Sequence, residues 1–194
     1  MGYPYSAHAV ELSKLRRAAG SKDAKLEAAL AKKYRAHYDE NAEWFADAIS
    51  KGAPTLARAV SDIIAGTVPK RSKHGFQYGY AVEVLVKHFG ARIDEDELGL
   101  GCEAAIDTYL KKAKQPSTDK LTKHGVFPVA IPAPRDFPGI GAMTANDMKS
   151  LLAAFDKTEP LWAKDAGAKE VAAAFRSWCT KALAKKRDLV WLYY

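Results

Sequence analysis

The most apolar stretch of the chain, residues 76–90 (FQYGYAVEVLVKHFG), limits how the rest of the protein can fold. Its apolar side chains recur at helical spacing, at Tyr78, Val82, Leu85 and Phe89. Glu83 and Lys87 form the one clearly polar row and are ordered for an i,i+4 ion pair. Gly90 supplies a helix stop.

The alternation of Tyr80, Val82, Val84 and Val86 would also suit a β-strand. The stretch spans 15 residues, however, whereas strands usually have about 4–8. A helix that is apolar on nearly every side is normally buried. We therefore predict a central core helix over residues 76–90.

Length and composition predict one soluble globular domain over residues 1–194. The chain is long enough for one domain with a substantial core, and two small domains are the less favoured alternative. Its 48% hydrophobic and 27% charged residues are typical of folded proteins. No apolar run approaches the roughly 20 residues that span a bilayer, and no secretory signal is visible. Cys102 and Cys179 are isolated thiols, which fits a reducing cytoplasm. We predict a cytoplasmic protein without a membrane partner.

The remaining patterns predict an α+β fold that is mostly helical, with about seven helices around the central one. Short strands are expected near residues 5–10, 126–131 and 188–194. The segment 126–131 contains proline and is therefore predicted as an edge strand. The terminal strands would secure both chain ends by pairing with each other or with 126–131. The acidic segment after Gly90 is predicted as a connection.

The net charge of +7 is unevenly distributed. Residues 1–75 carry 13 basic and 8 acidic groups, residues 76–110 carry 2 and 7, and residues 111–194 carry 15 and 8. A chain with this pattern becomes strongly dipolar once folded, so its total charge is a poor guide to its partners.

Two segments are candidates for binding a protein partner. The first is an acidic cluster, Asp94, Glu95, Asp96 and Glu97, which could also hold a cation or supply an acid–base pair, although four such residues usually form a solvated loop face. The second lies in the proline-rich block 126–141, at Arg135, Asp136 and Phe137. A stiff loop that presents Arg and Phe suits recognition. The structural alternative is that Phe137 enters the core and Asp136 caps a turn.

Two basic clusters are candidates for binding nucleic acid. Lys70, Arg71 and Lys73 precede the central helix, and Lys185, Lys186 and Arg187 follow the last one. Nucleic-acid binding requires such groups on one face, preferably with exposed aromatic rings or within a known module. No such module is visible, and a solvated face with a basic helix C-terminus explains the same residues.

Catalytic and cofactor motifs are weak. Residues 99–104 (GLGCEA) match a loose dinucleotide fingerprint, but the acidic ARIDEDEL precedes them where a buried strand is required. The histidines lack metal-ligand spacing, and no nucleophile elbow or phosphate-binding loop occurs. We therefore predict no cofactor, no metal and no catalytic residue.

Three blocks resemble a family of uncharacterised bacterial proteins: YSAHAVELSKLRRAAGSKDAKL, IPAPRDFPGIGAMTANDM and DLVWLYY. The most specific of these is PRDFPGIG, at residues 134–141. The resemblance covers nearly the whole chain and implies a single full-length domain from a bacterial source. The family has no established activity, so the resemblance implies no chemistry.

The sequence thus favours a non-catalytic cytoplasmic module that binds a protein partner, with an immunity-type protein as one form. A basic nucleic-acid-associated protein is the alternative, although the acidic middle segment argues against it. A small enzyme whose site assembles from scattered residues is the third reading.

Overall fold

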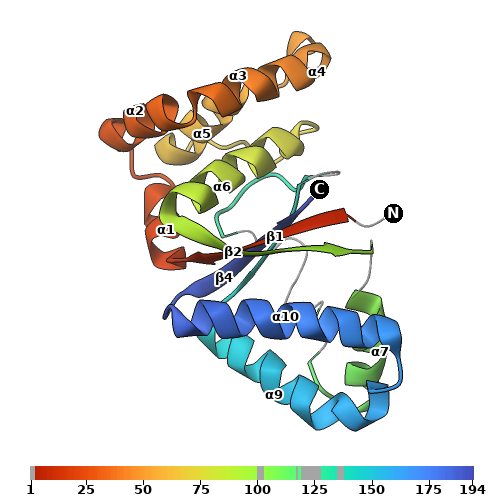
Figure 1. Cartoon of the computed structure of the whole chain (residues 1–194). Coiled ribbons are helices and arrows are strands. Elements are labelled where there is room, and N and C mark those ends of the chain that lie inside the picture. The colour runs from red at the N-terminus through yellow and green to blue at the C-terminus, as the bar shows by residue number, and fades with distance from the viewer. Residues whose placement is uncertain (1–2, 100–102, 117, 119–127, 135–137) are drawn as a thin grey trace. The chain divides into compact units, whose positions relative to one another are not determined.

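The computed structural model describes residues 3–99, 103–116, 118, 128–134 and 138–194. Its elements are β1 (Tyr3–Val10), α1 (Leu12–Ala18), α2 (Ala24–Lys33), α3 (Arg35–Trp44), α4 (Ala46–Ser50), α5 (Leu56–Ala65), α6 (Gly75–Phe89), β2 (Gly90–Leu98), α7 (Glu103–Lys112), β3 (Gly139–Met143), α9 (Ala145–Trp162), α10 (Ala166–Ala184) and β4 (Asp188–Tyr193) (Figure 1). The predicted α+β class, mostly helical with a small sheet, is confirmed. None of the described helices combines the length and apolarity needed to cross a membrane.

The chain separates into two compact units. Unit 1 contains Met1–Glu11, Gly90–Val126 and Ile140–Tyr194, and unit 2 contains Leu12–Phe89 and Phe127–Gly139. The sheet, apart from Gly139 at the start of β3, and helices α7, α9 and α10 belong to unit 1, whereas α1 to α6 belong to unit 2. The expectation of one domain over residues 1–194 stays a prediction.

The four strands are ordered β2-β1-β4-β3, so the two terminal strands lie side by side in the middle of the sheet. β1 and β4 pair antiparallel from Tyr5 opposite Tyr193 to Val10 opposite Asp188. The predicted pairing of the chain ends is therefore confirmed. Helices α7, α9 and α10 lie together on one face of this sheet (Figure 1). The core between them holds large buried side chains, among them Phe155, Phe175, Trp178 and Trp191.

The strand predicted at 126–131 is wrong for its described part, because residues 128–131 form bends and irregular backbone. Proline has no N–H to contribute to a sheet ladder, which disfavours strand pairing there. The strand comes later in the same block, at Gly139–Met143. Its small residues allow close packing, since a Cβ on Gly141 would stand 1.8 Å from Cζ2 of Trp191.

The predicted acidic connection after Gly90 is also wrong, because residues 90–98 form strand β2. This strand pairs antiparallel with β1 at the edge of the sheet, with a register shift opposite Ala7 and His8. Leu98 is buried in the core of unit 1, and Ile93 packs against that core. An edge strand tolerates charged side chains, so hydropathy gave little sign of it.

In unit 2 the predicted central helix is confirmed as α6, with Val82, Val84 and Leu85 fully buried. Helix α5 packs against it, and the Tyr78 hydroxyl donates a 3.0 Å hydrogen bond to Asp62 of α5. This burial and hydrogen bond raise the pKa of Tyr78 to about 12. The ion pair predicted between Lys87 and Glu83 is present.

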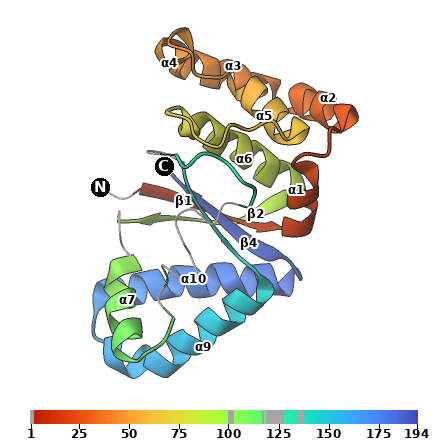
Figure 2. The same cartoon turned by 180° about the vertical axis from the view of Figure 1, so that it is seen from behind.

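The described residues 128–134 and 138, here named the proline strap, pack along α6 (Figure 2). A Cβ on Gly75 would stand 2.4 Å from the carbonyl oxygen of Ala133. A Cβ on Gly79, one helical turn later, would stand 3.0 Å from Cδ of Pro138. Glycine inside a helix costs roughly 0.5–1 kcal/mol relative to alanine, and here it permits this close approach.

Candidate functional site: a basic hollow

The surface of unit 2 carries an open hollow of about 460 Å³. One wall comes from the loop between α5 and α6, and the other comes from the proline strap. The lining residues are Lys70, Arg71, Ser72, Lys73, Pro132 and Ala133. The fold therefore brings together the first predicted basic cluster and the proline-rich block, which are far apart in the sequence. We call this feature the basic hollow.

Both ends of the loop are held by local hydrogen bonds. Helix α5 ends at Gly66, whose φ of 74° is left-handed, and Thr67 N–H donates to the Asp62 carbonyl at 2.9 Å. This is the backbone reversal that glycine provides at a helix C-terminus. At the other end, the Ser72 hydroxyl accepts a 3.0 Å hydrogen bond from His74 N–H, just before α6 begins. These hydrogen bonds therefore fix the backbone at both ends of the loop that carries the cations.

The cations of the basic hollow are not neutralised by the described part of the protein. Lys70, Arg71 and Lys73 are exposed, and among the described residues no carboxylate forms an ion pair with any of them. Like charges so close in sequence reinforce one another's potential, and the N-terminal end of the α6 dipole adds to it. The hollow is thus a positively charged concavity suited to an anion.

The charge of the whole unit has the same sign. Unit 2 contains 15 of the 30 Lys and Arg residues but only 9 of the 23 Asp and Glu residues. It therefore carries +6 of the net +7, and unit 1 carries +1. A field of this kind speeds the approach of an anionic partner.

The acidic cluster lies on β2 in unit 1, and its four side chains divide into two groups. Asp94 accepts hydrogen bonds from Ser177 at 2.7 Å and Lys181 at 2.6 Å, and Asp96 accepts one from the Trp178 indole at 2.6 Å. Glu95 and Glu97 are exposed, and Glu95 pairs with Arg92 at 2.9 Å. Two of the four candidate residues are therefore engaged by α10 rather than free for a partner.

The ionisation of Asp94 reflects these contacts. Partial burial by itself would raise the pKa of this carboxyl group. The hydrogen bonds from Lys181 and Ser177, together with the Lys181 charge, outweigh that effect and lower the pKa below its ordinary value. Asp94 is therefore a charged tie between β2 and α10.

The second basic cluster forms the end of α10 and the turn into β4, in unit 1. Lys185 is the C-cap of α10, and Lys186 adopts a left-handed φ of 53°. The Arg187 guanidinium lies 2.6 Å from a carboxylate oxygen of Glu11. This cluster follows the helix C-terminus, where the dipole favours cations, as the structural alternative predicts.

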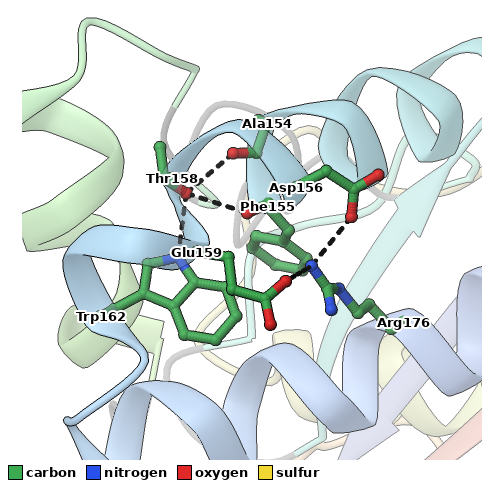
Figure 3. A network of polar contacts seen from close by, with 7 residues as sticks. All are labelled: Ala154, Phe155, Asp156, Thr158, Glu159, Trp162 and Arg176. Carbon is green, nitrogen blue, oxygen red and sulfur yellow. Dashed lines mark hydrogen bonds and ion pairs between the residues drawn. The ribbon is translucent and has the colours of Figure 1, made fainter.

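A polar network between α9 and α10 was not predicted from the sequence (Figure 3). One nitrogen of Arg176 contacts both Asp156, at 2.9 Å, and Glu159, at 2.8 Å, and its guanidinium lies 5.6 Å from the Trp162 ring centroid. The Trp162 indole in turn donates to the Thr158 hydroxyl at 2.9 Å. Since these contacts join two neighbouring helices, we interpret the network as structural.

The remaining candidates are the proline-block residues, the glycine motif and the two cysteines. Arg135, Asp136 and Phe137 lie outside the described residues, as do Cys102 and part of the glycine motif at 99–104. Cys179 is buried, and that burial raises the pKa of its thiol to about 12, as expected for an inert thiol. The described residues contain no group of three or more His, Cys, Asp or Glu side chains arranged to hold a metal ion.

The sequence predictions missed Ser72, Pro132 and Ala133 as lining residues, and Gly75 and Gly79 as the seat of the strap. Two glycines four residues apart inside an apolar helix are a usable signal, because glycine in a helix interior often marks a close approach. The partner of that approach could not be read from the spacing.

Comparison with known protein families finds a match. The family model described as a domain of unknown function (DUF7691) matches residues 1–194. The chain belongs to this family. The resemblance to an uncharacterised family is thereby confirmed, whereas the bacterial source stays a prediction. No curated protein and no solved structure matches this DUF7691 chain.

Proposed function

We propose that this DUF7691 protein is a non-catalytic bacterial cytoplasmic module that docks an acidic segment of a protein partner in the basic hollow. The observation that carries the proposal is the hollow itself, with three exposed cations that no described carboxylate neutralises. Arg is enriched among the residues that dominate binding energy at interfaces. An immunity-type protein, which acts by binding, is one form of this function.

The other partner-binding candidates are secondary in this proposal. Glu95 and Glu97 remain exposed on β2 and could contact basic groups of a partner, whereas Asp94 and Asp96 are already bound to α10. Arg135, Asp136 and Phe137 follow directly on the described part of the strap, and we retain them as candidate contacts.

Nucleic-acid binding is the second candidate, and the observation in its favour is the charge of +6 on unit 2. Single-strand binding usually combines a basic groove with aromatic rings on which bases stack. Loop residues 70–73 and strap residues 132 and 133 provide no aromatic ring to the hollow. We therefore expect only weak non-specific affinity for oligonucleotides, with Kd about 10⁻⁴–10⁻⁶ M at physiological salt.

The test compares three forms of the full chain as bait in a lysate of the source cell. These are the wild type, the hollow variant Lys70→Gln/Lys73→Gln, and the control Lys185→Gln/Lys186→Gln, which removes the same charge from unit 1. A captured protein is then purified and titrated directly against each form. We expect the hollow variant alone to lose this binding.

Labelled oligonucleotides are titrated beside this experiment at two salt concentrations, with fluorescence anisotropy as the readout. Sub-micromolar, salt-sensitive oligonucleotide binding that the hollow variant loses would favour nucleic-acid binding over protein docking as the function of the hollow. Equal partner binding by all three forms would show that the hollow is not the docking site.

A further inference from the structure

We infer that the basic hollow recognises a phosphate group on a phosphorylated segment of the protein partner. This inference rests on the proposed function, since it names the chemistry that the same hollow would bind. It goes further because a phosphorylated partner is subject to switching, whereas an acidic segment made only of Asp and Glu is not.

The donor set of the hollow is the first argument. Lys70, Arg71 and Lys73 contribute charged donors, and Ser72 contributes a hydroxyl group. The Ser72 oxygen already accepts from His74 N–H, which uses one of its two lone pairs, and its own O–H can still donate. Four consecutive residues thus line one wall with donors.

The anion that best matches this set is a phosphate monoester. It carries about −1.5 to −2 charges at pH 7 and three strong acceptor oxygens, whereas a carboxylate carries one charge and two oxygens. A guanidinium such as that of Arg71 can contact two phosphate oxygens at once, and lysines act as point charges around it. Three cations that no described carboxylate neutralises therefore suit one dianion better than one carboxylate.

The opposite wall supports the same chemistry. The carbonyl oxygens of Pro132 and Ala133 lie against Gly75, 2.9 and 2.4 Å from where its Cβ would stand. Two acceptors that would repel an anion are thus held against α6. The contact between this wall and Gly75 leaves no room for a methyl group, so the position of the wall is preorganised for ligand binding.

The experiment uses three fluorescein-labelled synthetic peptides that differ at one position, which is phosphoserine, glutamate or serine within the same Gly- and Ser-rich sequence. Each is titrated against the full-length protein at constant ionic strength, with inorganic phosphate as a competitor. We expect the phosphopeptide to bind at least about tenfold more tightly than the glutamate peptide, since charge-assisted phosphate contacts are the stronger ones. Inorganic phosphate should displace it.

Matched variants locate the site. Lys70→Gln/Lys73→Gln should weaken phosphopeptide binding by at least about tenfold, whereas Lys185→Gln/Lys186→Gln should leave it unchanged. Arg71→Lys keeps the charge but removes the planar fork, so it should reduce affinity for the phosphopeptide more than for the glutamate peptide.

The outcomes separate this inference from the proposed function. Equal affinity for the phosphoserine and glutamate peptides would overturn the phosphate inference while leaving an acidic docking site. Hollow-dependent capture of a partner that survives phosphatase treatment of the lysate would do the same. Phosphopeptide binding at the hollow without any hollow-dependent partner would support the anion site and overturn the docking function.

Discussion

Units 1 and 2 use their charged residues differently. In unit 1, Lys181 reaches Asp94 of β2, Arg176 joins α10 to α9, and Arg187 pairs with Glu11. In unit 2, the ion pairs of the described residues join positions three or four apart, as in Lys51 with Asp47. These three pairs of unit 1 therefore join distant elements, whereas no carboxylate of the described residues pairs with the hollow cations of unit 2. The contrast separates charges that stabilise the fold from charges available to a partner.

The largest effect should come from deleting residues 189–194, which removes a strand from the middle of the sheet of unit 1. Leu189, Val190, Trp191 and Leu192 are at most 1% exposed, and burying each such side chain contributes roughly 1.5–3 kcal/mol. The sum is comparable with the whole stability of a domain. We expect loss of the cooperative melt, measured by circular dichroism.

Hydrogen exchange on the same truncated protein tests the single-domain prediction. If residues 1–194 fold as one domain, the amides of α6 should lose protection together with those of α10. Persistent protection of α6 would instead show that unit 2 folds alone. An unchanged melting curve would mean that β4 does not contribute to stability.

Glycine-to-alanine substitutions compare packing in the two units. Gly141→Ala would place a methyl group 1.8 Å from the buried Trp191 ring, and Gly75→Ala would place one 2.4 Å from a backbone oxygen of the strap. Overpacking typically costs about 1–3 kcal/mol and occasionally more, so both should lower the urea midpoint. Gly99→Ala, which meets nothing within 4 Å, is the matched control and should be near neutral. A neutral Gly75→Ala would contradict the tight seat of the strap.

The ion pairs of unit 2 are not equivalent to one another. Glu83 is 3% exposed, so Lys87→Ala would leave a buried carboxylate without its cation and should cost about 1–3 kcal/mol. Lys51→Ala breaks an exposed pair with Asp47 and should change stability by less than about 0.5 kcal/mol. Urea unfolding of both variants measures the difference. Equal effects would show that the side chain of Glu83 reaches solvent.

The tie at Asp94 predicts a pH-dependent stability in unit 1. Because the folded-state pKa lies below its ordinary value, the contribution is complete above about pH 4 and is lost as the pH falls through the folded-state pKa. Asp94→Asn should therefore cost about 1 kcal/mol at pH 7, and that difference should shrink by pH 3. Chemical unfolding at both pH values tests this, with exposed Glu97→Gln as control. A cost that does not vary with pH would argue against a charged tie.

The smallest effect should come from the hollow itself. Lys70→Gln/Lys73→Gln removes two exposed cations without a described carboxylate partner, so stability should change by less than about 0.5 kcal/mol, or rise slightly as repulsion is relieved. Lys181→Gln, which breaks the contact with Asp94, should be destabilising. If the hollow variant is less stable than Lys181→Gln, the hollow cations stabilise the folded protein. That result would contradict the proposed difference between the two units.

Sequence patterns predicted the elements whose signal is local. Periodic apolar residues indicated α6, and the short strands expected near residues 5–10 and 188–194 correspond to β1 and β4. By contrast, β2 was missed because its charged residues do not alternate with apolar ones over most of its length. Strand identity there depends on pairing with β1, which is a long-range property.

The basic hollow was likewise predictable only in part from the sequence. The sequence by itself determined that Lys70, Arg71 and Lys73 form a basic loop before α6, and that a stiff proline-rich block follows much later. Only the tertiary structure decided that the strap lies on Gly75 and encloses the hollow with that loop. The same holds for Asp94. The sequence suggested an exposed carboxylate for a partner, whereas in the fold this carboxylate accepts a hydrogen bond from Lys181 of α10. Periodicity reports which face of an element is apolar, whereas charge neutralisation depends on residues that meet only when distant segments pack together.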